Sequence, residues 1–439
     1  MEWWIVLSVG LAILFALMLT GLPVFVAFLV LNLTGVLVLF GPRGFGLFSN
    51  SIYDTVTSPG FVTVPLFILM GEILFRSGTV DVLSRSMDTL VGFVRGRLYY
   101  LVVALSTVFG ALSGSAVAVA AMLGRSVLPR MEALGYDRRL SASTVLGGAS
   151  LAPIIPPSVL VIVVGSLVTD VSIAGLLIAG IVPGLLLAAA LVGFVAWRVA
   201  RDPAIAPAVE CPPADADGPP LRRLRAVLAM APFALIVFFV MGLILLGVAT
   251  PSEAAATGVA GAILTAATYR RLTLGMLSRA ALSAAITSAV ILVIVASSKL
   301  FSQLLAFTGA TTGLIGALGA LSLSDAAMLF CLMAIPFVLC MFIDQFAFLL
   351  LAIPLYEPIL DLYGYDPIWF GTLFLINLTV GSLTPPFGYT LFALKSAAPD
   401  MPIGELYRSA WPVVGIFVAG LFVLAVLPGL VTWLPARFG

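Results

Sequence analysis

The chain contains no histidine and few charged residues of either sign. Its 439 residues include 21 Lys and Arg and 20 Asp and Glu, which gives a formal net charge of +1. Without histidine there is no imidazole to bind zinc or haem or to act as a base. A near-neutral chain also lacks the basic excess that phosphate contacts with nucleic acid require. The composition therefore excludes much of enzyme chemistry and does not indicate a nucleic-acid partner.

Cysteine is scarce as well. Cys211, Cys331 and Cys340 show no metal-ligand spacing, and the last two lie in apolar runs where we expect them to pack. What is abundant is apolar sequence: the chain is 62% hydrophobic and 9% charged, with a mean hydropathy of +1.21. This predicts an all-α, multi-pass membrane protein with about ten spans. The run beginning at Trp3 follows Glu2 instead of a basic segment, so we expect a retained span.

The sequence also repeats itself. Pro156-Pro157 and Pro385-Pro386 lie 229 residues apart, and each pair follows a Gly-Tyr-Asp turn by the same spacing. The same offset relates Pro183 to Pro412. We therefore predict a duplicated membrane unit, whose two turns (135–137 and 364–366) cap the helices that follow them.

Charge indicates that the second copy is inverted. Arginines surround the central segment of the first copy, whereas positions 305–368 in the second contain no Lys or Arg. Because basic residues favour the cytoplasmic side, the two equivalent surfaces should lie on opposite sides of the membrane. The segment from Leu98 to Leu128 has arginines at both ends and is interrupted by Ser113-Gly114-Ser115. We expect it to form a re-entrant hairpin from the cytoplasm, with a matching tip at 342–344 that enters from outside.

The Pro-Pro pairs predict two broken helices. Proline lacks an N–H and clashes with the preceding turn, so carbonyls between Gly148 and Ile155 should lose their helical partners. Such oxygens can bind sodium, and the helix that starts after each break can attract a carboxylate. The candidate sodium- and substrate-binding residues are Ser113, Gly114, Ser115, Gly148, Ser150, Ala152, Ile154 and Pro156 in the first half, and Ile343, Asp344, Asn377, Gly381, Thr384 and Pro385 in the second.

Each signal has a second interpretation. Pro-Pro also occurs as a simple kink, Ser-Gly-Ser also occurs where membrane helices pack closely, and Asp344 could also cap the following helix. Ser113, Ser115 and Asp344 could belong to an intramembrane hydrolase, but the chain offers no histidine base and no His-Glu-x-x-His stretch. A passive channel is a further alternative, which inverted paired breaks do not favour.

These stretches resemble the large membrane subunit of tripartite ATP-independent periplasmic (TRAP) transporters, the DctM type within the ion transporter superfamily. The resemblance covers nearly the whole chain. The stretches that carry it are 109–115 (FGALSGS), 154–158 (IIPPS), 179–184 (AGIVPG), 341–344 (MFID), 366–371 (DPIWFG) and 377–388 (NLTVGSLTPPFG). Many members have an acidic residue where this chain has Val119 and a Glu where it has Thr379, so the number of coupled sodium ions stays open.

The resemblance implies a sodium-coupled importer of organic acids in the bacterial inner membrane, with no other cofactor. A periplasmic binding protein would deliver the substrate, and a small four-helix subunit of the DctQ type would join the large one. The stretch after Thr384 is most similar to members assigned to 2-oxoacid, mannitol or chloroaromatic uptake. A stand-alone sodium/carboxylate symporter or antiporter without a binding protein is the alternative.

The resemblance also implies an elevator-type fold in which a carrier moves against a scaffold. The expected first repeat is 1–200, with scaffold helices 3–40, hairpin 98–128 and broken helix 140–168. A cytoplasmic connector follows at 201–225. The expected second repeat is 226–439, with scaffold helices 226–269, hairpin 323–358 and broken helix 367–397.

Overall fold

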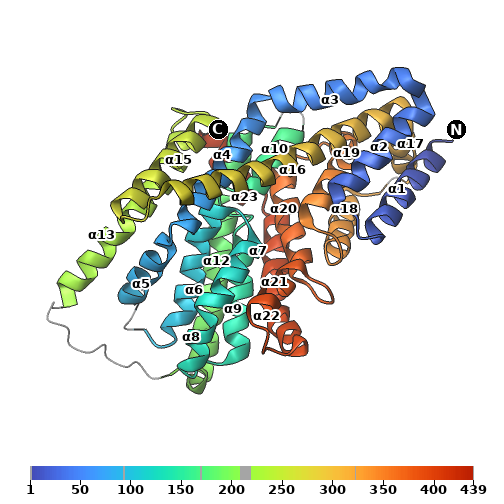
Figure 1. Ribbon diagram of the computed structural model, residues 1–439. Coiled ribbons are helices and arrows are strands. Elements are labelled where there is room, and N and C mark those ends of the chain that lie inside the picture. Colours follow the sequence, from blue (N-terminus) through green and yellow to red (C-terminus); the bar gives the residue numbers. More distant parts are fainter. Residues whose placement is uncertain (1, 92–93, 169–170, 208–218, 322, 439) are drawn as a thin grey trace.

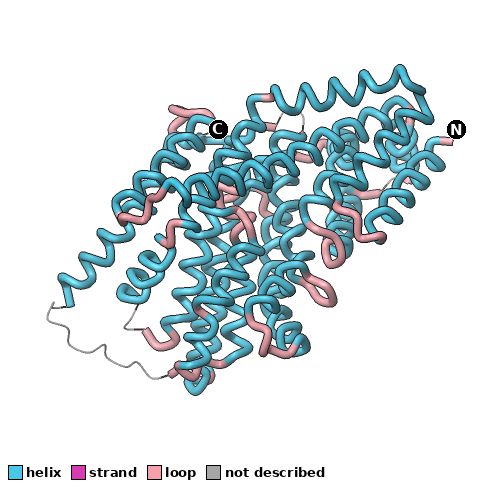
Figure 2. Tube along the Cα trace, viewed as in Figure 1, coloured by secondary structure: helices cyan, strands magenta, loops and turns pink. Residues whose placement is uncertain are grey.

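In a computed structural model of the protein, residues 2–91, 94–168, 171–207, 219–321 and 323–438 are described. These ranges contain helices and connecting loops and no β-strand (Figure 2). The expected all-α architecture is thereby confirmed. Its physical reason is that a helix satisfies nearly all of its backbone hydrogen bonds internally, which an apolar environment demands.

The outer helices come from the start of each half. The first half contributes α1 (Trp3–Leu19), α2 (Val24–Phe40), η1 (Gly41–Gly44), α3 (Phe45–Thr57), α4 (Pro59–Arg76) and α5 (Thr79–Val91). The second half contributes α13 (Pro219–Val237), the π-helical turn η3 (Phe238–Gly242), α14 (Leu243–Leu245), α15 (Pro251–Thr268), α16 (Leu274–Phe307) and α17 (Ala310–Ala320). The long helix α16 crosses the molecule and packs against α2, α3 and α4 (Figure 1).

The remaining helices form the inner part of the molecule. From the first half these are α6 (Arg97–Ser113), α7 (Ala116–Ser126), α8 (Leu128–Ala133), α9 (Arg138–Leu151), α10 (Val159–Leu167), α11 (Ile173–Ala179), α12 (Ile181–Arg201) and η2 (Pro203–Ile205). From the second half they are α18 (Asp325–Leu339), α19 (Gln345–Tyr363), α20 (Pro367–Leu383), α21 (Tyr389–Ala397), α22 (Ile403–Val426) and α23 (Gly429–Phe438). Helices α7, α9 and α12 lie beside α21 and α22 (Figure 1), so the two halves interlock.

Two helix boundaries differ from the ranges expected from the sequence. The connector is shorter than 201–225, because α13 already begins at Pro219; its residues 208–218 lie outside the described part. The second hairpin does not end at residue 358, because α19 continues through Pro354 and Pro358. It ends at Tyr363, where Gly364 adopts a left-handed conformation with φ of 64°. Glycine accommodates that turn without strain.

Four helices in the described part are long and apolar enough to cross a membrane, or five if the bent pair α3 and α4 counts as one span. The four segments are Ile173–Arg201, Leu224–Leu245, Leu274–Phe307 and Ile403–Val426. This is fewer than the ten or so spans predicted from apolar runs. The reason is that several runs form helices of only 10–17 residues, such as Trp3–Leu19 and Pro367–Leu383.

Small residues let α6 and α9 approach each other closely. A Cβ atom added to Gly110 would lie 2.7 Å from Cα of Ala152, and one added to Gly148 would lie 2.2 Å from Oγ of Ser106. Small residues are common where membrane helices touch, because they allow the backbones to come together. This contact brings the end of the first hairpin arm, near Ser113, to the end of α9.

Gly110→Ala should therefore destabilise the protein, because the new methyl group would collide with the backbone of α9. Overpacking of this kind costs about 1–3 kcal/mol. The matched control is Gly193→Ala in α12, where an added Cβ meets no atom within 4 Å. We expect a lower apparent melting temperature in detergent for the first variant only. Equal melting temperatures for both variants would contradict the close packing.

Candidate functional site

The first helix break lies between α9 and α10. Helix α9 ends at Leu151, α10 begins at Val159, and the Pro156–Pro157 peptide between them is cis. Some of the carbonyls in this segment do have hydrogen-bond donors. Leu151 O accepts from the N–H groups of Ile154 and Ile155, at 3.0 and 2.9 Å. Ser150 Oγ donates to Leu146 O at 2.9 Å.

A hydroxyl group bridges this break. Ser158 Oγ donates to Pro153 O at 2.8 Å and accepts from Val161 N at 3.5 Å, so one side chain serves both helix ends. In the described part of the chain, no donor is found for the carbonyl oxygens of Ala152, Ile154 and Pro156. Only some of the carbonyl oxygens at this break are therefore without a hydrogen-bond donor.

The second break has the same form. Helix α20 ends at Leu383, α21 begins at Tyr389, and the Pro385–Pro386 peptide is also cis. Thr384 Oγ donates to Val380 O at 2.7 Å, and Thr384 N donates to Gly381 O at 3.1 Å. The hydroxyls of Ser382 and Thr390 lie 3.3 Å apart and connect the two helix segments. Both breaks are thus held by hydroxyl groups, at different positions.

The first tip lies against the first break. Helix α6 ends at Ser113, Gly114 turns the chain with φ of 61°, and Ser115 caps α7 by accepting from Ala118 N at 3.3 Å. A Cβ added to Gly114 would lie 2.8 Å from the backbone nitrogen of Val159. Only glycine therefore fits between this tip and the start of α10. The Ser113 and Ser115 side chains are partly exposed beside this contact.

The second tip is formed by residues 340–344. Asp344 Oδ1 accepts from the backbone N–H groups of Phe346 and Ala347, at 3.0 and 3.3 Å, so this carboxylate does cap α19. In the described residues Oδ2 makes no hydrogen bond. Ile343 continues the turn, because its N–H donates to Leu339 O at 2.9 Å. Asn377 on α20 supports the first arm by donating to Met333 O at 2.5 Å.

Gln345 holds the second tip to the second break. Its Nε2 donates to Ser382 Oγ at 2.6 Å, and both side chains are buried. Gly381 allows this approach, because a Cβ added there would lie 2.7 Å from Cβ of Cys340. Sequence reasoning missed Gln345 and Ser382. Their counterparts 229 residues earlier are Ala116 and Pro153, so comparison of the repeats gave no signal.

The two breaks differ in accessibility. Residues 151–165 are buried throughout, whereas Pro385 is partly exposed and Pro386 is exposed. Phe342 on the second tip is 57% exposed and Phe387 in the second break is 53% exposed. Their ring centroids are 5.4 Å apart. Sequence reasoning missed this pair too, because the counterparts are Ser113 and Ser158. An aromatic surface therefore borders the accessible break only.

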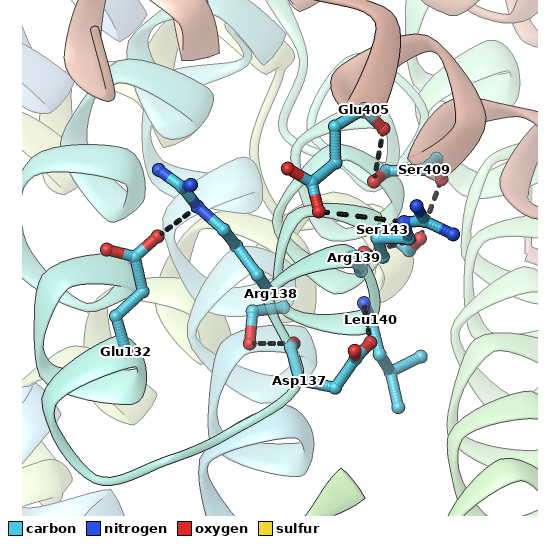
Figure 3. A network of polar contacts seen from close by, with 9 residues as sticks. Glu132, Asp137, Arg138, Arg139, Leu140, Ser143, Glu405 and Ser409 are labelled. Atoms are coloured by element: carbon cyan, nitrogen blue, oxygen red, sulfur yellow. Dashed lines mark hydrogen bonds and ion pairs between the residues drawn. The ribbon is translucent and has the colours of Figure 1, made fainter. Parts of the chain in front are cut away.

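A polar network ties the first broken helix to the second half (Figure 3). Arg139 Nε and Glu405 Oε1 are 3.5 Å apart, and Ser143 Oγ donates to Ser409 O at 2.6 Å. Asp137 caps α9 by accepting from Leu140 N at 2.8 Å, and Asp366 caps α20 by accepting from Trp369 N at 2.7 Å. The predicted capping role of both turns is confirmed. Helices α9 and α22 therefore begin side by side.

The donor atoms at the tips and breaks suit a monovalent cation better than a transition metal. The described residues contain no group of three or more His, Cys, Asp or Glu that could hold a metal ion. They do offer hydroxyl oxygens at the first tip and at the second break, carbonyl oxygens at both tips, and the carboxylate of Asp344. Unwound carbonyls and helix ends of this kind coordinate sodium in membrane proteins. Among these residues no hydrogen bond joins one tip to the other.

Comparison with known proteins identifies the same family over almost the whole chain. The profile of "Tripartite ATP-independent periplasmic transporter, DctM component" matches residues 11–430. The ectoine/5-hydroxyectoine TRAP transporter large permease UehC of Ruegeria pomeroyi is 30% identical, and the alignment covers 92% of this chain and 94% of UehC. The C4-dicarboxylate TRAP transporter large permease DctM of Pseudomonas aeruginosa is also 30% identical, covering 93% and 94%. The YdaH transporter of Alcanivorax borkumensis shares the fold, with a TM-score of 0.64 at 17% identity and coverage of 92% and 97%.

Ser158→Ala should destabilise the first break, because it leaves the buried Pro153 carbonyl without a donor. An unsatisfied buried acceptor costs about 1–3 kcal/mol. Ser126→Ala is the control, since Ser126 Oγ donates to Met122 O from an exposed position. We expect a lower apparent melting temperature for the Ser158 variant alone. A Ser158 variant as stable as the control would show that the bridging hydroxyl is dispensable.

Proposed function

Because the chain belongs to the DctM component family of tripartite ATP-independent periplasmic transporters, we propose that it imports organic acids with sodium as the coupling ion. It is a multi-pass protein of the bacterial inner membrane and a transporter component, not an enzyme. In this proposal it receives substrate from a periplasmic binding protein and works with a small DctQ-type membrane subunit. The observation that carries the proposal is the contact of each hairpin tip with a helix break in its own half.

Sodium would bind at the two tip-and-break sites. In the first half the ligands would come from Ser113, Gly114 and Ser115 and from the segment 148–156, in which Ala152, Ile154 and Pro156 have carbonyls without a donor. In the second half they would come from Ile343, Asp344, Asn377, Gly381, Thr384 and Pro385. Asp344 is the one carboxylate in this set, and its free oxygen supports a role beyond capping. Ionisable groups at membrane depth are usually functional.

The substrate would bind at the second break. Helix α21 begins there, and the backbone N–H groups of its first turn attract a carboxylate. This break is exposed, whereas the start of α10 is buried, so an anion can reach α21. Relatives named for C4-dicarboxylates are consistent with an organic acid as substrate. The exposed rings of Phe342 and Phe387 would contact the apolar part of that acid.

We propose that the inner helices act as a carrier and the outer helices as a scaffold. The carrier would comprise both hairpins and both broken helices, in two repeats of opposite orientation. An asymmetry between the halves supports this movement: α10 lies against the outer helix α4, whereas the equivalent α21 lies against α7.

Asp344→Asn should weaken sodium coupling while preserving the helix cap, because asparagine caps as well as aspartate. A charged ligand contributes about 1.5–3 kcal/mol of binding free energy, so its loss should weaken the apparent sodium affinity roughly 10- to 100-fold. Ser115→Ala should also reduce sodium-dependent uptake. The measurement is substrate uptake into proteoliposomes that contain both membrane subunits, with and without the loaded binding protein.

Asp366→Asn is the matched control, because Asp366 caps α20 in the same way at an exposed position. It should retain wild-type sodium dependence. Unchanged sodium dependence in the Asp344 and Ser115 variants would remove both from the site. Uptake that is equally fast without the binding protein would favour the stand-alone symporter instead.

Phe342→Ala and Phe387→Ala should raise the KM for substrate and leave the sodium dependence intact. Each substitution should remove about 1 kcal/mol of apolar contact energy with the substrate, which predicts a roughly fivefold higher KM. Phe330→Ala is the control, because Phe330 lies on the same hairpin arm and is exposed away from the pair. Equal KM values for all three variants would exclude the aromatic pair from substrate contact.

A further inference from the structure

A basic cavity lies outside the two tip-and-break sites. It has a volume of about 500 Å³ and lies between the end of α4, the loop from α15 to α16, and the first turns of α16. Helix α4 lies beside both α15 and α16 (Figure 1). The lining residues are Glu72, Phe75, Arg76, Ser77, Arg271, Thr273, Met276 and Arg279. We call this space the arginine cavity.

The charge of the arginine cavity is only partly compensated. Arg76 forms an ion pair with Glu72, the one acidic residue in the lining. In the described part of the chain, the guanidinium groups of Arg271 and Arg279 form no hydrogen bond or ion pair. Two guanidinium groups from different segments therefore face one space without a protein partner. Guanidinium groups match the geometry of phosphate oxygens and bind them through paired hydrogen bonds.

The local backbone is arranged to bring Arg271 to the cavity. Arg270, at the end of α15, has a left-handed conformation with φ of 54° and is the one non-glycine residue with positive φ in the described chain. This conformation costs an L-residue roughly 1–2 kcal/mol. Thr273 then caps α16 by accepting from Met276 N at 3.1 Å. The turn between α15 and α16 thus places Arg271 in the lining of the cavity.

Apolar side chains border the same cavity. Phe75 and Met276 line it, and Phe75 is 50% exposed. Leu274, the residue after the lining residue Thr273, is 87% exposed. A soluble anion would leave these side chains in water. A phospholipid would cover them with its acyl chains while its phosphate meets the arginines. The counterparts of Arg271 and Arg279 in the first half are Pro42 and Asn50, so this combination occurs in one half only.

We propose that the arginine cavity binds a phosphate group, supplied by the headgroup of an anionic phospholipid in the cytoplasmic leaflet. Basic pockets between membrane helices at this surface suit such headgroups. The bound lipid would join the ends of α4 and α16. The proposal does not depend on the transport mechanism, because the cavity shares no residue with the tips or breaks.

The test uses the full-length protein, purified in detergent and titrated with phosphatidylglycerol, phosphatidylcholine or inorganic phosphate, with bound lipid measured by native mass spectrometry. Wild type should bind phosphatidylglycerol in preference to phosphatidylcholine. The double variant Arg271→Ala/Arg279→Ala should bind phosphatidylglycerol at least about tenfold more weakly, because two charge-assisted contacts are lost.

The control double variant, Arg408→Ala/Arg437→Ala, removes the same charge elsewhere and should bind as wild type does. Melting temperatures without lipid will show that both variants are folded, and Arg271→Lys/Arg279→Lys should restore part of the affinity. Displacement of phosphatidylglycerol by millimolar inorganic phosphate would support the phosphate site but assign it to a soluble anion. Equal binding of the two lipids by wild type, or unchanged binding by the Arg271/Arg279 double variant, would overturn the proposal.

Discussion

The need to satisfy every backbone polar group in an apolar environment governs this structure. Continuous helices meet that need by themselves, but each half contains a proline pair at which a helix stops and restarts. At the first break Ser158 supplies a hydrogen bond to Pro153 O. At the second, Ser382 and Thr390 connect the two segments. Only a few acceptor oxygens, such as those of Ala152, Ile154 and Pro156, are left without a donor in the described residues.

The breaks depend in turn on the hairpin tips beside them. Gly114 rests against the start of α10, and Gln345 bonds to Ser382 at the end of α20. A shift of either tip would therefore change the surroundings of the oxygens at its break. The two tip-and-break pairs have similar local structures but different accessibility. The first break is buried, whereas the second is exposed beside Phe342 and Phe387. One copy is thus closed while the other is accessible.

The inner helices of both halves form one body. The network around Arg139, Ser143 and Glu405 fixes the start of α9 to α22, while α7 packs against α21. Gly124 makes the second contact possible, since a Cβ there would lie 2.7 Å from a methyl carbon of Leu394. The arginine cavity lies at the ends of the outer helices instead.

The sequence alone determined the features that depend on neighbouring residues. Proline pairs stop helices, Gly114 and Gly364 permit left-handed turns, and Asp137 and Asp366 cap the helices after them, so these points could be located without coordinates. The resemblance to the DctM family, carried by the same stretches, is confirmed. The sequence did not show that α13 starts at Pro219, or that α19 continues through Pro354 and Pro358, because a single proline does not reveal whether a helix stops there.

The tertiary structure alone decided which side chains complete each site. Gln345 forms a hydrogen bond with Ser382, which lies 37 residues later in the sequence, and Phe342 contacts Phe387, which is also far from it in the sequence. Arg271 lines the same cavity as Arg76. None of these residue types recurs at the equivalent position of the other half, so the repeat could not reveal them. Local rules set where a helix begins and ends, but contacts between distant segments depend on how whole helices pack, and that packing is a property of the complete fold.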